Sequence, residues 1–472
     1  MVKPVLFPHQ MAAIDAKAIE SVPIEALIER AGMALAIKAI NLMNGCYGKK
    51  VKILSGKGHN GDDGRVAGGI LASRGASVEI LDAHQGIKSI YGCDLVIDAA
   101  FGTGLKAGFD APKVDSKIPV LAADIASGVQ GDLGIVPKGA IKATSTVTFG
   151  ALKLGLLINQ GPQFSGEVEV APIGLNIEKA DIYLVEDKDL QQHLPKRSRD
   201  SHKWKTSTLI IAGSPGFSGA ALLASKAAMR AGAGMVRLGI PGADLAQVDF
   251  GEAVGLTLPK QNWHLEAEKV LSRFKSIVLG PGLGTSVETE KAIEYLVANS
   301  QVGLVLDADA LNVLKTKQHL AELIRHRNKN PNAHKVVITP HEAEFARLFG
   351  EQVGPNRVEQ AIELARFCSA VVLLKGSTTV VANDKGNVLL VNTGNSRLAT
   401  AGTGDVLSGI IGAFIARGLG TFEAAAFAAH AHGAASRLGF EEGLIASDLF
   451  ELLAQYLSSL PNLDTDCVVQ YS

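Results

Sequence analysis

Hydrophobic residues recur along the first part of this chain at two different spacings. Apolar positions three and four residues apart, among them Met11, Ile14 and Leu27, predict helical structure over residues 10–42. Short apolar runs then alternate with helical stretches, and these runs predict strands at residues 51–54, 78–81, 95–98, 120–124 and 146–149. Alternation of strands and helices is typical of a parallel sheet covered by helices, so the pattern predicts an α/β fold.

The same alternation starts again after residue 205. Strands are predicted at residues 208–212, 277–279, 304–307, 336–339 and 371–374, with helical segments between most of them and a strand-rich insert over 378–391. The stretch from about residue 175 to residue 205 is charged and irregular. We therefore expect two α/β domains, residues 1–195 and residues 196–472, each with three layers.

Composition and charge narrow the class of protein. A formal net charge of -1 gives no reason to expect a nucleic acid or an anionic membrane as partner. No apolar run approaches the roughly 20 residues that cross a bilayer, and prolines interrupt the N-terminal stretch where a signal peptide needs a continuous apolar segment. The cysteines lack metal-site spacing and are typical of reduced thiols: Cys46, Cys93, Cys368 and Cys467. We expect a soluble, cytoplasmic protein.

Polar residues stand where several predicted strands of the first domain end. A glycine-rich loop over residues 56–64 carries Asn60, and Asp98, Asp124 and Ser127 follow later strands. Because the carboxyl ends of parallel strands meet at one edge of a sheet, these side chains can lie close together. Their oxygens suit a hard cation. A single aspartate in such a place more often caps the next helix, but repetition across the strands favours a site.

A second glycine-rich segment lies near the C-terminus. The small residues 400–404 lead into an apolar helical pattern that begins at Val406. Unpaired N–H groups at a helix start attract a phosphate or a developing oxyanion. Asp405 stands at this mouth, where its carboxylate could take a proton from a substrate hydroxyl, and the helix start should keep it largely ionised. The alternative for a lone motif of this kind is a capping aspartate behind a flexible loop.

Several motifs occur in an order that resembles a known family. The second half carries residues 280–284 (GPGLG), 306–311 (LDADAL), 338–344 (ITPHEAE), Lys375-Gly376 and the loop before Asp405, and this series resembles the ADP/ATP-dependent NAD(P)H-hydrate dehydratases, relatives of ribokinase-like kinases. Residues 56–64 resemble the signature loop of the NAD(P)H-hydrate epimerases. The resemblance implies a Rossmann-like three-layer sandwich followed by a ribokinase-like three-layer α/β/α domain, as in bifunctional nicotinamide nucleotide repair enzymes.

For the second domain, the resemblance implies that Asp405 takes the proton of the C6 hydroxyl of the hydrated nicotinamide ring, whose oxygen then attacks the terminal phosphate of ADP or ATP in the presence of Mg²⁺. It also implies a hydrate site at Ala220, Gly284 and His341, although His341 alone would be interpreted as a helix-start residue. The residues that it implies for the nucleotide are Lys375, Gly376, Ser377, Thr378, Thr379, Asn395, Ser396, Arg397, Leu398, Ala399, Thr400, Ala401, Gly402, Thr403 and Gly404.

For the first domain, the resemblance implies a K⁺ ion bound by Asn60, Asp98 and Ser127, and Asp124 and Lys153 as the residues that move protons between R and S hydrates. The residues that it implies for the hydrate are His59, Asn60, Gly61, Asp62, Asp63, Gly102, Thr103, Gly104, Leu105, Lys106, Ala107 and Gly108, with Asp124. His59, Asp62 and Ala126 depart from the family pattern, and Asp62 puts a charge where bare backbone is expected to approach a phosphate-bearing ligand.

Other interpretations remain open at this point. A ribokinase-like kinase for a small alcohol, with a non-catalytic N-terminal binding module, would also need the Asp405 loop. In a third interpretation, the first domain is a binding or regulatory module that has lost its chemistry through His59 and Asp62. The main hypothesis has the hydrates of NADH and NADPH as its substrates, and the alanine-rich helices make a homo-oligomer the expected assembly.

Overall fold

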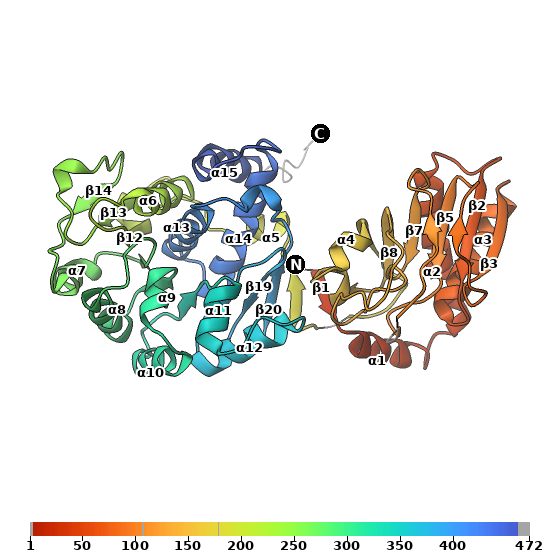
Figure 1. The fold of residues 1–472 in the computed structure, drawn as a ribbon, viewed down its shortest axis with the longest axis horizontal. Helices are drawn as coiled ribbons and strands as arrows, with labels where there is room; N and C mark the ends of the chain where they lie inside the picture. Colours follow the sequence, from red (N-terminus) through yellow and green to blue (C-terminus); the bar gives the residue numbers. More distant parts are fainter. Residues whose placement is uncertain (1–2, 106–107, 178, 461–472) are drawn as a thin grey trace, which may run out of the picture. The chain divides into compact units, whose positions relative to one another are not determined.

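The computed structural model describes residues 3–105, 108–177 and 179–460 (Figure 1). Contacts divide the chain into an N-terminal unit, Lys3–Ile182, and a C-terminal unit that starts at Tyr183. This boundary lies earlier than the expected one after residue 195. The irregular stretch contains β11 (Ile182–Leu184) and α5 (Asp187–His193), and Asp187 Oδ1 lies 2.7 Å from His430 Nε2. Helix α5, in the stretch from about residue 175 to residue 205, therefore packs with the second unit. The hydrophobic pattern of the sequence did not indicate this contact.

The sheet of the N-terminal unit is parallel throughout, in the order β10-β8-β7-β5-β2-β3. Its strands are β2 (Lys50–Ser55), β3 (Ser77–Asp82), β5 (Leu95–Ala99), β7 (Val120–Ala123), β8 (Ser145–Phe149) and β10 (Glu167–Ala171). Helices α2 (Ile24–Leu42) and α3 (His59–Ser73) pack on one face, where Leu35 and Leu71 meet Ile53 and Ile97. All five predicted strands are thus confirmed.

Smaller elements complete this unit. They are β1 (Lys3–Leu6), which pairs with β9 (Leu152–Lys153), the pair β4 (Ser89–Ile90) and β6 (Lys113–Val114), α1 (Pro8–Ala18), α4 (Gly161–Ser165) and the short helix η1 (Leu154–Leu156). The helical stretch predicted over residues 10–42 is two helices, because Pro23 lies between them. A proline inside a helix removes a backbone donor and clashes with the preceding turn, so α2 begins only after it.

The sheet of the C-terminal unit runs in the order β14-β13-β12-β15-β16-β17-β18-β19-β20-β11. Its strands are β12 (Ser207–Ile211), β13 (Met235–Gly239), β14 (Val254–Leu256), β15 (Ser276–Leu279), β16 (Gly303–Leu306), β17 (Val336–Ile338), β18 (Val371–Leu374), β19 (Thr379–Ala382) and β20 (Val388–Val391). Pairing is parallel from β14 to β18 and antiparallel through β19 and β20, which form the predicted insert. Strands β13 and β14 were not predicted.

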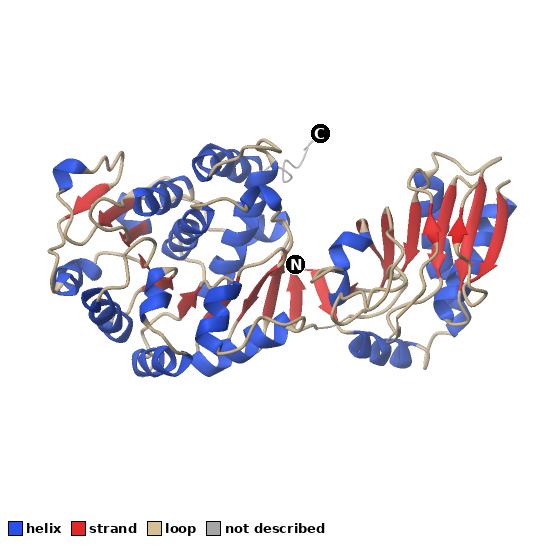
Figure 2. Ribbon diagram, in the orientation of Figure 1, coloured by secondary structure: helices blue, strands red, loops and turns tan. Residues whose placement is uncertain are grey.

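Helices cover both faces of this second sheet (Figure 2). The helices are α6 (Gly219–Arg230), α7 (Trp263–Leu271), α8 (Val287–Asn299), α9 (Asp309–Val313), α10 (Lys317–Arg327), α11 (Glu342–Phe349), α12 (Arg357–Cys368), α13 (Thr403–Ala416), α14 (Thr421–Arg437) and α15 (Leu449–Ser459), with short helices at Lys203–Thr206, Leu245–Gln247, Ser396–Leu398 and Ala446–Asp448. Helices α6 and α13 approach closely at Gly409, where a Cβ would lie 2.1 Å from the carbonyl oxygen of Ala224. Within the described ranges, no helix has the length and apolarity needed to cross a membrane.

Candidate functional site

The ends of three neighbouring strands and the start of α13 converge on one buried carboxylate in the C-terminal unit. Asp307, which follows β16, is 1% exposed. Its Oδ1 accepts hydrogen bonds from Lys375 Nζ at 2.7 Å and from Thr339 Oγ1 at 2.7 Å, and its Oδ2 accepts one from Ser408 Oγ at 2.6 Å. Thr339 and Lys375 follow β17 and β18, so this network fixes Lys375 in relation to α13.

The Lys375 ammonium lies at the first turn of α13. A Cβ at Gly404 would be 3.6 Å from Lys375 Nζ. Burial alone would raise the pKa of Asp307, but the charge of Lys375 and the hydroxyl groups of Ser408 and Thr339 outweigh it and hold this pKa below its usual value. Asp307 is therefore ionised. Positive charge beside unpaired helix-start N–H groups makes this end of α13 a site for a phosphate group.

Asp405 occupies the first turn of the same helix and is half-buried. Burial and the neighbouring charge of Asp307 raise its pKa to about 6, against the opposing effect of Lys375. We expected the helix start to set the pKa of Asp405, but desolvation by burial is the larger effect and raises this pKa. With this pKa, about nine-tenths of the group is ionised at pH 7, which allows Asp405 to act as a base.

Two of the predicted nucleotide residues use their side chains to build the loop. Thr403 Oγ1 donates to the carbonyl oxygens of Leu398 and Thr400 at 2.9 and 3.0 Å. Arg397 Nη1 donates to the carbonyl oxygens of residues 436, 437 and 439, at the end of α14. Gly402 precedes α13 with a φ of 90°, a conformation that favours glycine. For Thr403 and Arg397, the backbone rather than the side chain is left for a ligand.

The predicted hydrate residues of this unit lie at the start of α6 (Ala220), in the loop after β15 (Gly284) and at the start of α11 (His341). Gly284 N donates to Asp309 Oδ2 at 2.8 Å, and a Cβ at Gly282 would lie 3.3 Å from the Cβ of Ala220, so two of these segments are adjacent. His341 caps α11, because its Nδ1 accepts from the N–H groups of residues 343 and 344. The prediction that His341 stands at the start of a helix is therefore confirmed, and its Nδ1 is used for capping.

Sequence reasoning missed three residues near Lys375. Asp307 was named only as the last residue of a predicted strand. In the first domain, polar residues at the ends of strands were the observation that predicted a site. Arg357 Nη2 donates to the Lys375 carbonyl oxygen at 3.0 Å. His432 is 6% exposed, and burial together with the charge of Lys375 lowers its pKa to about 4, so it is neutral. Nothing in the local sequence of Arg357 or His432 distinguishes them from ordinary helix residues.

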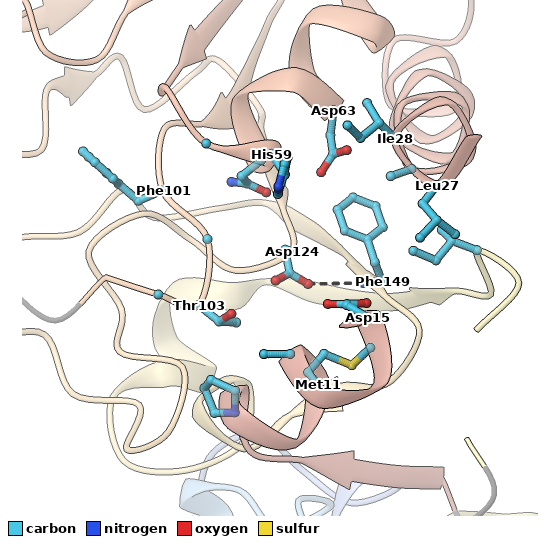
Figure 3. A pocket seen from close by; sticks show the side chains of 18 of the residues that line it. Met11, Asp15, Leu27, Ile28, His59, Asp63, Phe101, Thr103, Asp124 and Phe149 are labelled. Atoms are coloured by element: carbon cyan, nitrogen blue, oxygen red, sulfur yellow. Dashed lines mark hydrogen bonds between the residues drawn. The ribbon is translucent and has the colours of Figure 1, made fainter. Parts of the chain in front are cut away.

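The N-terminal unit contains a cavity of about 860 Å³ (Figure 3). Its walls come from α1, α2 and α3 and from the loops that follow β2, β5 and β7. The polar side of the lining contains Asp15, His59, Asn60, Asp63, Asp124 and Lys153, and the apolar side includes Met11, Leu27, Ile28, Phe149 and Leu175. The cavity lies at the carboxyl edge of the parallel sheet, where ligands bind in open α/β folds.

Asp124 and Lys153 form a nearly buried ion pair in this cavity. Lys153 Nζ lies 2.5 Å from Asp124 Oδ1 and also donates to Thr148 Oγ1 and to the Phe149 carbonyl oxygen. Asp124 Oδ1 further accepts from Thr148 Oγ1 at 3.0 Å and from Phe149 N at 3.3 Å. Asp124 has a φ of 64°, a left-handed conformation that is uncommon outside glycine. The pair predicted from sequence is thus brought together and firmly held.

Asn60, Asp98 and Ser127 surround the segment 100–102. Ser127 Oγ donates to Asp98 Oδ1 at 2.6 Å and accepts from Phe101 N at 2.9 Å, while a Cβ at Gly102 would lie 3.6 Å from the Cβ of Asn60. Asp98 is fully buried, and burial raises its pKa to about 6. No cationic side chain pairs with it within the described residues. Asn60 Nδ2 is also buried without a hydrogen-bond partner.

The predicted loop residues divide into those that line the cavity and those that do not. The lining residues are His59, Asn60, Asp63, Gly102, Thr103, Gly104 and Leu105, whereas Gly61, Asp62 and Gly108 are absent from the lining. Lys106 and Ala107 lie outside the described residues. The Asp62 side chain contacts its own helix instead. Its carboxylate lies 2.5 Å from Arg65 Nη2 and 3.6 Å from His59 Nδ1, because Arg65 is three positions along the same helix.

Two cavity carboxylates, Asp63 and Asp15, differ from Asp124 in having no hydrogen-bond or ion-pair partner among the described residues. Burial, followed by repulsion from Asp124, Asp62 and Asp15, raises the pKa of Asp63 to about 8. Burial also raises the pKa of Asp15, which Lys153 opposes. Asp15 was not among the predicted site residues, because on sequence it is only a polar position in a helical pattern. The break at Pro23 leaves α1 as a separate helix, and α1 contributes Asp15 to the cavity.

Comparisons with known proteins match both units. Residues 208–458 match the family model described as NAD(P)H-hydrate dehydratase, and residues 24–90 and 79–155 match the model described as YjeF-related protein N-terminus. A bifunctional NAD(P)H-hydrate repair enzyme of Moorella thermoacetica is 32% identical over 93% of each chain. Its counterpart in Escherichia coli K12 is 32% identical over 86% of this chain and 84% of that protein.

Solved structures match the C-terminal unit. The ADP/ATP-dependent NAD(P)H-hydrate dehydratase of Bacillus subtilis, co-crystallised with ATP and Mg²⁺, has a TM-score of 0.50 and 28% identity over 58% of this chain and 98% of that chain. A ribokinase-like superfamily protein of Enterococcus faecalis, at 21% identity with a TM-score of 0.50, supports the fold alone. With matches to both units and to relatives over nearly its whole length, this chain belongs to the family of bifunctional NAD(P)H-hydrate repair enzymes.

Proposed function

We propose that the C-terminal unit dehydrates the S form of NAD(P)H hydrate with ADP or ATP as phosphoryl donor, and that Asp405 is the base. The observation that carries this proposal is the position of Asp405 in the first turn of α13, beside the Lys375–Asp307 ion pair. A carboxylate that is ionised at neutral pH adjoins a positively charged site for a phosphate group. Phosphoryl transfer requires this combination of positioning and charge more than covalent chemistry.

In this reaction Asp405 takes the proton of the C6 hydroxyl, and the resulting oxygen attacks the terminal phosphate of the nucleotide. The P–O bond to the rest of the nucleotide breaks, and AMP leaves from ADP or ADP leaves from ATP. Phosphate then leaves C6 as the ring loses a proton, which restores NADH or NADPH. Lys375 and the helix-start N–H groups of α13 stabilise the charge on the transferring group. Asp307 keeps Lys375 in place. The ATP and Mg²⁺ of the Bacillus subtilis enzyme support a nucleotide donor here.

Mg²⁺ would neutralise part of the negative charge of the nucleotide phosphates during the transfer. Across the described residues, no three His, Cys, Asp or Glu side chains are grouped as a metal site. That part of the chain therefore offers no carboxylate cage for Mg²⁺, and the nucleotide would supply most of the ligands. That distribution is usual for Mg²⁺ at phosphoryl-transfer sites.

The N-terminal unit is proposed to interconvert the R and S hydrates in its cavity. The fixed Asp124–Lys153 pair would contact the reacting ring. K⁺ fits the residues present, because the fully buried Asp98 carboxylate has no cationic partner in the described part of the chain and the adjacent Ser127 and Asn60 supply further oxygen atoms. K⁺ would neutralise Asp98 and stiffen the loops around Phe101. Asp62 is directed to Arg65 and does not occupy the cavity, so it gives no reason to exclude epimerisation.

The test is an assay on a mixture of R and S hydrates with Mg²⁺, K⁺ and either ADP or ATP, followed by the absorbance of the reduced nicotinamide. Recovery of all the hydrate, faster than spontaneous epimerisation allows, would support both activities. A plateau at the S fraction would support the dehydratase and contradict the epimerase. No recovery with either nucleotide would contradict the proposal, and a stable phosphorylated alcohol among the products would favour a kinase instead.

A further inference from the structure

Two carboxylates in the N-terminal cavity are available to a ligand in a way that Asp124 is not. Asp63 is 7% exposed, Asp15 is half-buried, and neither side chain has a hydrogen bond or an ion pair within the described residues. Asp124 Oδ1 instead accepts from Lys153, Thr148 and Phe149. A buried polar group without a hydrogen-bond partner is costly in either protonation state, so an unpartnered carboxyl group that faces a cavity points to contact with a ligand.

The two carboxylates come from different walls. Asp63 belongs to α3 and Asp15 to α1, and Figure 3 shows them reaching toward the region of Asp124 from separate helices. Each lies close enough to Asp124 to feel its charge, and Asp63 also feels that of Asp15. Lys153, His59, Lys57 and His84 are the other charged or titratable groups in the lining. Asp62, outside the lining, adds a repulsive charge to Asp63.

The chemistry of the hydrate needs an acid on one face of the ring and a base on the other. Its hydroxyl is on a carbon bonded to the ring nitrogen. When an acid protonates that hydroxyl, the C6–O bond breaks, water leaves, and the nitrogen lone pair forms an iminium cation. Water then adds to C6 from the opposite face and gives its proton to a second group. One proton has passed from the first carboxyl group to the second, and the reverse reaction returns it.

We propose that Asp15 and Asp63 are this acid–base pair, one serving each face of the hydrated ring, while the Asp124–Lys153 pair stays intact and positions the substrate. The inference rests on the proposed epimerase function of this unit. It assigns the proton transfers to the unpartnered carboxylates rather than to the ion-paired residues. The negative charge of the cavity aspartates also stabilises the iminium cation while it exists.

The experiment uses the full chain with Asp15→Asn, Asp63→Asn and the double variant. Asp132→Asn is the matched control, because Asp132 is exposed, lies outside the cavity and keeps its hydrogen bond to Leu133 N as an asparagine. Epimerisation is measured on R hydrate, and dehydration of S hydrate by the C-terminal unit of the same samples reports on intact protein. Each cavity variant should lose about 10²–10⁴-fold in kcat for epimerisation with little change in KM, as expected for an acid or base.

A second measurement follows the oxygen. In water enriched in ¹⁸O, the wild-type chain should place label in the C6 hydroxyl at the rate of epimerisation, and the variants should lose both together. Unchanged kcat, a change confined to KM, or epimerisation without label would overturn the inference while leaving the epimerase function standing. A wild-type chain that dehydrates S hydrate but does not accelerate epimerisation would refute the proposed epimerase function and the inference together.

Discussion

The pKa of Asp405 predicts how dehydration should depend on pH. The base must be ionised, and burial beside Asp307 raises its pKa to about 6. The activity is therefore nearly complete at pH 7 and falls as pH decreases through 6, with about one-tenth of the groups ionised at pH 5. The expected loss in kcat/KM is about tenfold between pH 7 and pH 5, since this ratio reports the free enzyme. An unburied aspartate would lose little over that range.

The assay measures initial rates of reduced nicotinamide formation at concentrations of S hydrate and nucleotide well below their KM values, so that the rates report the free enzyme, and the spontaneous reaction is subtracted at each pH. A terminal phosphate also titrates near pH 6, so a fall in rate at low pH could come from the nucleotide as well as from Asp405. Asp405→Asn separates the two causes. Its rate should be about 10²–10⁴-fold lower and should no longer fall between pH 7 and pH 5.

The matched control is Asp249→Asn, an exposed aspartate of the same unit that accepts a hydrogen bond from Gly251 N, which an asparagine can also do. It should keep the wild-type rate and profile. A flat wild-type profile would refute the raised pKa. An acid limb that persists in Asp405→Asn would show that another group, such as the nucleotide phosphate, is responsible. Unchanged turnover in this variant would remove Asp405 from the mechanism.

Three further predictions follow from individual contacts. Lys375→Met should lower nucleotide-dependent dehydration by about 10²–10³-fold. Because it leaves Asp307 buried without its counter-charge, it should also lower the free energy of unfolding by about 3 kcal/mol. Lys385→Met, at an exposed position, should change neither quantity. Replacing K⁺ with an organic cation should lower the thermal midpoint of the N-terminal unit, and Asp98→Asn should remove that response; a midpoint independent of the cation would contradict the K⁺ site. Asp62→Gly should leave epimerisation within about threefold of the wild-type rate, because Asp62 contacts Arg65 rather than the cavity, and a large gain would show that its charge does oppose the ligand.

Much of the fold follows from patterns in the sequence. The buried strands of parallel sheets are continuous apolar runs, and a run such as residues 95–98 or 371–374 can be recognised without knowing its partners. Edge strands are harder. β13 and β14 at the edge of the second sheet have mixed burial, and β1 depends on pairing with β9, nearly 150 residues away. Such strands are decided by what they pair with, which no local window contains.

The candidate site divides in the same way. Asp405, Lys375 and Asp124 were predictable because each lies at a glycine-rich turn or at a strand end, where short-range rules place polar groups on one edge of a sheet. The sequence alone also determined the order of motifs that carries the family resemblance. The sequence could not show that the Asp62 side chain contacts Arg65. The same helix is compatible with an Asp62 side chain that points into the cavity and with one that contacts Arg65.

Only the tertiary structure decided which aspartates are paired and which are free. Asp307 becomes part of the proposed dehydratase site because strand ends at residues 307, 339 and 375 meet beside α13. Asp15 becomes part of the cavity because α1 ends before Pro23 and contributes to its wall. Burial and the distance between charges set the pKa of a carboxyl group, and both quantities arise from contacts between segments that are distant in the chain.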